Sequence, residues 1–192
     1  MKKISVLILA LAISAIACKQ NKKEDTIEDI EVTETVVQEM VTPKTLTIAL
    51  SAKSDSNVSG KVVFTEENGT VNMMATVSGI EPGEHAIHLH ETADCSANDG
   101  SSTGGHWNPT NQPHGAWGAE SGYHKGDIGN FTADENGNAT VEFSTDLWCI
   151  GCDDDTKNIV GKGVIIHAGV DDLTSQPSGA AGARVSCAGI IE

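Results

Sequence analysis

The sequence is poor in basic side chains, and arginine occurs only once, at Arg184, in 192 residues. Lysine and arginine together number 12 against 27 aspartate and glutamate residues, which gives a formal net charge of −15. Nucleic acids and anionic membrane surfaces carry the same sign of charge, so electrostatic binding to either is unfavourable. We therefore expect no nucleic-acid partner.

Aromatic residues are also scarce, at 4% of the chain, whereas glycine occurs 20 times. Few large side chains and many turn-forming residues favour short strands over long helices. No apolar run is long enough for a transmembrane helix, because the longest, residues 4–17, falls short of the roughly 20 residues that a bilayer requires.

The first 17 residues have instead the layout of an export signal, with Lys2 and Lys3 before the apolar run and small residues at its end. The stretch "AISAIAC" resembles a bacterial lipoprotein signal, which implies cleavage before Cys18 and acylation of that cysteine. Acyl chains hold a protein to a membrane surface without spanning it. We predict an exported protein of the cell envelope or periplasm, attached to a bacterial membrane through lipid alone.

Residues 18–43 comprise the lipidated cysteine and an acidic tether. A few lysines are followed by acidic residues interleaved with β-branched ones in "EDTIEDIEVTETVVQEM". Repelling charges and β-branching favour a flexible spacer over a helix. The folded domain is then predicted to occupy residues 44–192.

This domain has the pattern of an all-β protein. "TLTIALS" alternates with period two, as a half-buried strand does, and about eight such segments are separated by turn signals. "GDIGNFTAD" and "ATVEFST", joined by the turn "ENGN", are interpreted as a β-hairpin. An antiparallel β-sandwich or barrel is the predicted architecture.

One long segment, residues 91–125, shows no periodicity. A structureless loop of this length inside a compact domain is uncommon and is usually functional. It carries Cys95 and three histidines, His106, His114 and His124. We expect cross-links, covalent or through metal, to hold it in place.

A pair of histidines precedes this loop in "GEHAIHLHETADC". Residues two apart on a strand point to one face, so His88 and His90 project together while Ile87 and Leu89 face the core. Such an H-x-H pair can ligate one ion, although by itself it is weak evidence. His85 falls on the other face and is expected to be structural.

The loop strengthens the metal hypothesis. His106, His114, His124 and Asp127 follow the spacing H-x7-H-x9-H-x2-D, and three imidazoles with one carboxylate form a closed tetrahedral set suited to zinc. The alternative, solvated loop histidines, explains this concentration poorly. His167, at the end of the strand "GVIIH", completes the candidates.

The motifs "GEHAIHLHETADC", "GGHWNP", "HKGDIGN", "IIHAGVDDL" and "GARVSC" together resemble the copper/zinc superoxide dismutase family in order and near-family spacing across residues 44–192. The resemblance implies an eight-stranded Greek-key β-sandwich or barrel with long metal-binding and disulfide loops. It also implies an antioxidant oxidoreductase that converts superoxide to dioxygen and hydrogen peroxide.

The resemblance further implies specific roles for individual residues. Copper is expected at His88, His90, His106 and His167, and zinc at His106, His114, His124 and Asp127. His106 would thus bridge both metals and take part in proton delivery.

Outside the ligand sets, Asp171 matches the family's outer aspartate, which hydrogen-bonds a histidine of each site, and Asp172 is the less favoured candidate. Cys95 and Cys187 match the family disulfide. Arg184 matches the arginine that orients superoxide beside copper.

Two features depart from the family. The loop between Asp171 and Arg184 is shorter than in the eukaryotic members and lacks their lysine and paired glutamates, so steering of superoxide is expected to be weaker or to come from elsewhere, with Lys125 as a candidate. The motif "WCIGC" adds Cys149 and Cys152, for which a local disulfide is expected in an oxidising compartment. A redox-active C-x-x-C and a copper-loading site are the alternatives.

Two other functions compete with the enzyme. A non-catalytic copper/zinc-binding protein of the same fold would store or deliver metal, and such relatives typically lack copper ligands or the arginine. A structural, adhesin-like sandwich would leave the histidines unexplained. The complete set of residues favours the enzyme, while the choice between monomer and homodimer stays open.

Overall fold

The structure is a computed structural model that describes residues 42–192. The predicted signal peptide, the predicted lipidation site Cys18 and nearly all of the predicted tether lie outside the described residues. Within residues 42–192, no helix has the length and apolar character needed to cross a membrane.

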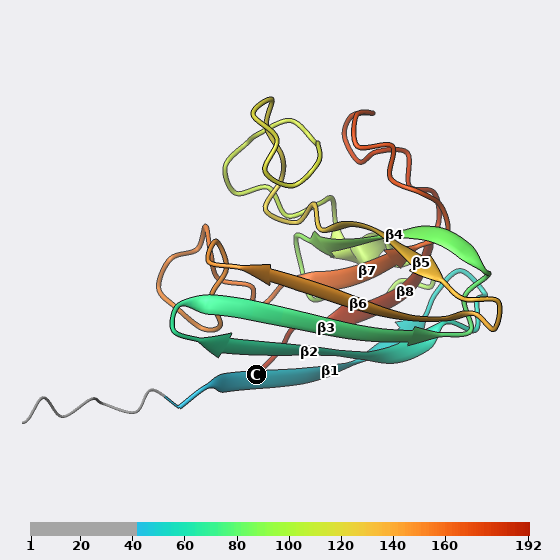
Figure 1. Ribbon diagram of the computed structural model, residues 1–192, viewed down its shortest axis with the longest axis horizontal. Helices are drawn as coiled ribbons and strands as arrows, with labels where there is room; N and C mark the ends of the chain where they lie inside the picture. The colour runs from blue at the N-terminus through green and yellow to red at the C-terminus, as the bar shows by residue number, and fades with distance from the viewer. Residues whose placement is uncertain (1–41) are drawn as a thin grey trace, which may run out of the picture. The chain divides into compact units, whose positions relative to one another are not determined.

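Eight β-strands and one 3₁₀ turn make up the described chain (Figure 1). They are β1 (Lys44–Ala52), β2 (Ser59–Glu67), β3 (Thr70–Ser78), β4 (Gly83–His90), η1 (Ser101–Thr103), β5 (Gly129–Ala133), β6 (Asn138–Thr145), β7 (Gly163–His167) and β8 (Arg184–Gly189). The all-β prediction is confirmed.

The strands form two antiparallel, four-stranded layers, β1-β2-β3-β6 and β5-β4-β7-β8, which join where Ser51 of β1 pairs with Cys187 of β8. The complete order is β5-β4-β7-β8-β1-β2-β3-β6. The chain therefore crosses between layers after β3, after β5 and after β6. These crossings give the Greek-key arrangement that the sequence predicted.

The predicted hairpin of residues 126–134 with residues 139–145 is wrong. β5 pairs with β4, with Phe131 opposite His85, and β6 pairs with β3, with Val141 opposite Ala75. The turn between them, closed by the Gly137 N–H that donates to the Asp134 carbonyl, carries the chain from one layer to the other. Each strand covers the common core from its own layer, which a β5–β6 hairpin would not achieve.

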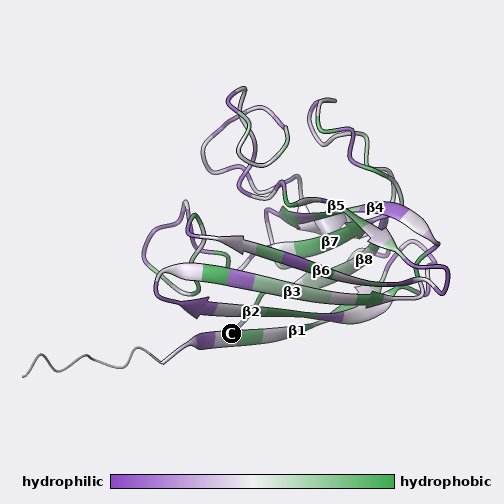
Figure 2. Ribbon diagram, in the orientation of Figure 1, coloured by the Kyte–Doolittle hydropathy of each residue, from purple (hydrophilic) through white to green (hydrophobic). Residues whose placement is uncertain are grey.

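The core lies between the layers because alternate residues of the strands are apolar. In β3 the buried positions are Val71, Met73, Ala75 and Val77, and hydrophobic and hydrophilic bands alternate along the strand (Figure 2). Phe64, Ile87 and Ile166 are buried with them. Burying side chains of this size stabilises the fold by about 1.5–3 kcal/mol each.

Two long connections, residues 91–128 and 168–183, leave the strands on the side of β4 and β7 (Figure 1). They are tied to each other, because the Gln176 amide donates to the His114 carbonyl and accepts a hydrogen bond from the His114 N–H. Strands β4 and β7 and the connection 91–128 supply every candidate ligand, and the connection 168–183 supplies Asp171.

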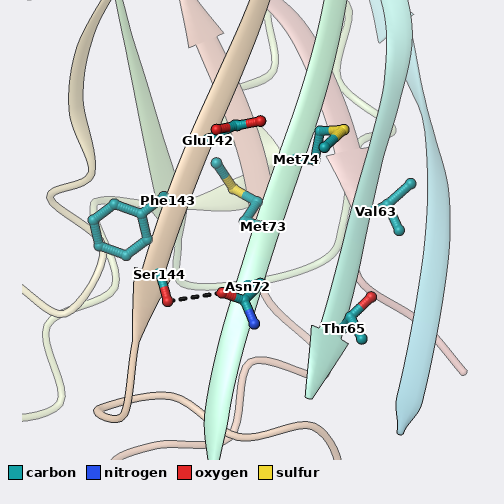
Figure 3. A pocket seen from close by; sticks show the side chains of 8 residues that line it. All are labelled: Val63, Thr65, Asn72, Met73, Met74, Glu142, Phe143 and Ser144. Atoms are coloured by element: carbon teal, nitrogen blue, oxygen red, sulfur yellow. Dashed lines mark hydrogen bonds between the residues drawn. The ribbon is translucent and has the colours of Figure 1, made fainter. Parts of the chain in front are cut away.

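A surface depression lies away from these connections, on the outer face of β2, β3 and β6. It has a volume of about 490 Å³ and is lined by Val63, Thr65, Asn72, Met73, Met74, Glu142, Phe143 and Ser144 (Figure 3). Ser144 Oγ donates to Asn72 Oδ1 at 2.8 Å. Only one lining residue, Glu142, is titratable, so we assign this depression no chemistry.

Candidate metal centre

Strands β4 and β7 bring the first three histidines together. In this antiparallel pair His88 lies opposite Ile165, and the pairing of β7 with β8 shifts register between Ile166 and His167, as at a β-bulge. The ring centroid of His167 consequently lies 5.0 Å from that of His88 and 5.5 Å from that of His90.

The fourth histidine, His106, comes from the long loop but is held like a strand residue. It forms an isolated antiparallel bridge with His90, flanked by the hydrogen bond from the Trp107 N–H to the Leu89 carbonyl at 2.8 Å. Its ring centroid lies 4.0 Å from that of His88. All four rings are buried, and each offers one nitrogen within 4.8 Å of the others: His88, His90, His106 and His167, here called the first group.

The second group consists of His106, His114, His124 and Asp127, with potential ligand atoms also within 4.8 Å of one another. The buried Asp127 carboxylate lies 2.8 Å from His106 Nδ1, 3.0 Å from His114 Nδ1 and 3.2 Å from His124 Nδ1. The backbone N–H groups of Gly115 and His124 also donate to it. The loop thus folds around a carboxylate.

His106 belongs to both groups. Its Nδ1 faces Asp127 in the second group, and its Nε2 has no hydrogen-bond partner within residues 42–192. One imidazole therefore offers a nitrogen to each group.

The pattern of unpaired nitrogens tests whether these residues fit metal ions. Four buried ring nitrogens lack a hydrogen-bond partner in the described chain: His88 Nδ1, His106 Nε2, His114 Nδ1 and His124 Nδ1. Leaving buried polar atoms unpaired is costly and calls for a partner. His114 Nδ1 lies 3.0 Å from the Asp127 carboxylate but forms no hydrogen bond with it. Two atoms that bind the same metal ion have this relation, because both point at the ion rather than at each other.

The opposite nitrogens of several rings are occupied and fix the ring orientations. His90 Nδ1 faces the Gly104 carbonyl at 3.0 Å, and His167 Nδ1 faces the Gly182 carbonyl at 3.3 Å. A metal-binding histidine usually uses its second nitrogen in this way. The residues fit metals: an all-imidazole group suits copper, and three imidazoles with a carboxylate suit zinc.

The protonation states agree with this donor set. Burial lowers the pKa of His106 to about 4 and the pKa of His167 to about 3, with neighbouring histidines contributing. Burial alone would raise the pKa of Asp127, but hydrogen bonds from His106 and His124 keep it below its usual range. At neutral pH His106 and His167 are therefore neutral and the Asp127 carboxylate is charged, which are the forms that bind metal.

Asp171 lies where one carboxylate can contact both groups. Its Oδ2 is 2.8 Å from His88 Nε2, and its Oδ1 is 2.8 Å from His114 Nε2. Although burial opposes ionisation, the hydrogen bonds of His88 and His114 lower the pKa of Asp171 to about 2. Asp172 instead accepts hydrogen bonds within an exposed turn, from Thr174 and Ser175.

The backbone of Asp171 is held by Asn130, which sequence reasoning missed. The Asn130 amide accepts from the Asp171 N–H and donates to the Asp171 carbonyl, both at 2.8 Å. The two residues are 41 positions apart, so no local pattern indicates the contact.

A cleft of about 370 Å³ opens onto the first group. It is lined by His90, Glu91, Gly105, His106, Asn108, His124, His167, Pro177, Ser178, Gly182 and Arg184. Arg184 is the only basic side chain other than histidine in this lining. Lys125 lies outside it, beside a separate depression that contains Glu120 and Tyr123.

The remaining cysteines and His85 lie outside the two groups. A disulfide joins Cys95 to Cys187, three residues after Arg184, and a second joins Cys149 to Cys152. Both thiols of "WCIGC" are thereby paired. The ring nitrogens of His85 lie 2.9 Å from the Ala168 carbonyl and 2.7 Å from the Glu81 carbonyl.

Comparisons with known proteins agree with this architecture. The family model described as copper/zinc superoxide dismutase (SODC) matches residues 58–190. A double mutant of a SOD-like protein from Bacillus subtilis, with a tyrosine and a proline each replaced by histidine, is 28% identical with a TM-score of 0.69, covering 76% of this chain and 97% of that one. The clock protein EA4 is 31% identical with a TM-score of 0.67, covering 78% of this chain and 96% of its own.

Proposed function

This chain belongs to the copper/zinc superoxide dismutase family, and we propose that it is an active superoxide dismutase that converts two superoxide anions and two protons to dioxygen and hydrogen peroxide. The alternative is a non-catalytic copper/zinc-binding protein for storage or delivery. The fold alone does not separate the two, because its structural neighbours include a SOD-like protein and a clock protein.

The observation that carries the proposal is the shared ring of His106. It offers one nitrogen to each of two buried groups, and one of these groups opens onto a cleft that also contains Arg184. A store or carrier of metal has no need for a cation beside the cleft, whereas an enzyme acting on a small anion does. We propose copper at the first group and zinc at the second.

Copper held by the first group would supply the one-electron chemistry of dismutation by alternating between Cu(II) and Cu(I), while zinc has no redox chemistry and its site would be closed. The protein's part is binding and proton delivery. Arg184 would attract and orient the anion, and His106, whose Nε2 has no hydrogen-bond partner among the described residues, would give a proton to the reduced oxygen species. The second proton would come from solvent at the cleft.

The cellular setting is part of the proposal. We propose an exported protein, anchored through Cys18 to a bacterial membrane and located in the cell envelope or periplasm. Two disulfides support an oxidising compartment, since they rarely persist in the cytosol.

The test combines metal analysis of the mature protein with an assay of superoxide consumption. We expect one copper and one zinc per chain, loss of activity when copper is removed, and recovery when copper is restored. Metal-replete protein without dismutase activity would contradict the enzyme and favour the binding protein.

A further inference from the structure

The guanidinium of Arg184 is held by one short turn, η1 with its flanking glycines, here called the 100–104 turn. Nη1 donates to the Gly100 carbonyl at 2.8 Å and to Thr103 Oγ1 at 2.9 Å, and Nη2 donates to the Gly104 carbonyl at 2.8 Å. Gly100 has a φ of 71°, and a Cβ there would lie 3.3 Å from the Cβ of Arg184. The turn therefore fits closely against the arginine.

Thr103 is the only member of this turn whose side chain hydrogen-bonds Arg184. It is fully buried, and its hydroxyl donates to the Gly100 carbonyl at 2.9 Å while it accepts from Nη1. Its methyl group packs against β7, since a Cβ at Gly163 would lie 3.0 Å from Thr103 Cγ2. The hydroxyl hydrogen is thus used by the Gly100 carbonyl, and a lone pair of the oxygen accepts from the guanidinium.

The acceptors around Arg184 are all neutral. Within residues 42–192 the guanidinium forms no ion pair, and Asp99 and Glu91 act on it only at longer range. A guanidinium has five N–H donors, so Nε–H and one N–H of Nη2, on adjacent nitrogens, keep no partner among the described residues. The turn fixes the orientation of Arg184 without neutralising the charge that a substrate anion needs.

We propose that Thr103 is a positioning residue for Arg184: its buried hydroxyl holds the guanidinium so that its free N–H donors serve the substrate anion. This inference rests on the proposed function for its kinetic consequence, but the orientation of Arg184 can be measured separately. No sequence motif indicates Thr103, which is 81 positions away from Arg184.

The kinetic test compares three variants of the full protein with equal metal content. Thr103→Val keeps the volume and methyl contacts but removes the hydroxyl, and we expect kcat/KM for superoxide to fall about three- to tenfold. Thr103→Ser restores the hydroxyl and should recover most of this loss. Thr92→Val is the matched control, because the Thr92 hydroxyl donates to the Ser102 carbonyl of the same turn without contacting Arg184.

The second readout is side-chain NMR of the zinc-loaded, copper-free protein. Arg184 is the only arginine in the chain, so its Nε–H group gives a single signal. Slow rotation of the guanidinium, seen as separate Nη protons, is expected in the wild type and in Thr92→Val, with faster rotation in Thr103→Val. A freely rotating guanidinium in the wild type would overturn the proposal even if Thr103→Val did not fold.

Equal kinetics and equal rotation in Thr103→Val and wild type would overturn it as well. If the wild-type protein had no dismutase activity, the proposed function would fail, while the NMR comparison would still decide whether Thr103 positions Arg184.

Discussion

At the scale of single residues, the cleft depends on few charges. Arg184 is the one permanently cationic side chain in its lining, and Glu91 is an acidic one, in a protein whose formal net charge is −15. The attraction of an anion to this cleft is therefore local, and it should be sensitive to single substitutions.

We expect Arg184→Ala to lower kcat/KM for superoxide about 10- to 100-fold, because hydrogen bonds made by a charged group contribute a few kcal/mol. Arg184→Lys keeps the charge but not the fixed array of donors, so an intermediate rate is expected. Steady-state assays at low ionic strength, with metal content measured in each sample, provide the test. Unchanged activity in Arg184→Ala would remove this residue from the mechanism.

A second substitution addresses the carboxylate between the two groups. Asp171→Asn replaces one of the two carboxylate oxygens by an NH₂ group, which cannot accept a hydrogen bond. The variant can therefore accept from the ring N–H of His88 or of His114, but not from both. Loss of such outer contacts typically lowers metal affinity 10- to 100-fold, so we expect weaker zinc binding in a chelator competition.

Asp172→Asn is its control, because the neighbouring carboxylate contacts only an exposed turn and its retained Oδ1 can still accept from Thr174 and Ser175. If both variants bound zinc equally well, Asp171 would have no part in the site.

At the scale of elements, the long loop is anchored by an aromatic cluster. Trp117 and Tyr123 from the loop pack with Phe143 and Trp148, with neighbouring ring centroids 4.8–5.9 Å apart. Trp148 Nε1 donates to the Lys125 carbonyl at 2.9 Å. Lys125 stands between His124 and Asp127, so this bond fixes part of the second group from outside.

We therefore expect Trp148→Phe to lower the free energy of unfolding and to weaken zinc binding more than the same change at Trp117. Both substitutions reduce the ring, but only Trp148 has an indole N–H partner among the described residues, and leaving the Lys125 carbonyl unpaired adds about 1–3 kcal/mol. Urea unfolding and zinc competition on the two variants measure the difference. Equal losses would show that the hydrogen bond is immaterial.

The strands illustrate what the sequence could predict at this scale. Alternation in β1 and β3 and the H-x-H pair of β4 are local patterns. The structure has a strand at each of these segments, as the patterns predict. Pairing is decided by distant segments instead. "ENGN" has the residues of a hairpin turn, yet β5 pairs with β4 and β6 pairs with β3. Each of the two strands extends a different layer by pairing with a strand that precedes it in the sequence.

The candidate site was predictable to the extent that its residues have chemistry and spacing that point to metal. The two histidine groups and Asp127 met that condition. Thr103, Asn130 and Trp148 did not, because common residue types acquire their roles only through contacts with positions 81, 41 and 23 residues away. Such contacts leave no periodic trace in the chain.

At the scale of the whole molecule, the buried histidines make stability depend on pH. The folded metal-free domain keeps His106 and His167 neutral, with pKa values of about 4 and about 3, whereas the unfolded chain protonates them near the ordinary value of 6.5. The unfolded state therefore binds more protons as the pH falls below 6.5, and the free energy of unfolding decreases.

Between pH 7.5 and 5, His106 alone should lower the free energy of unfolding of the metal-free protein by about 2 kcal/mol. Urea unfolding of chelator-treated protein at the two pH values measures this loss. A free energy of unfolding that did not change over this interval would contradict the buried, neutral state of these rings.

The position of Asp171 has a thermodynamic consequence for assembly. One carboxylate orients a ring in each of two neighbouring groups, and a third ring is common to both. An ion that enters either group first restricts the same side chains that the other group requires. Occupation of one site must then change the affinity of the other by the same factor whichever is filled first, so two metal ions would bind as a thermodynamically linked pair.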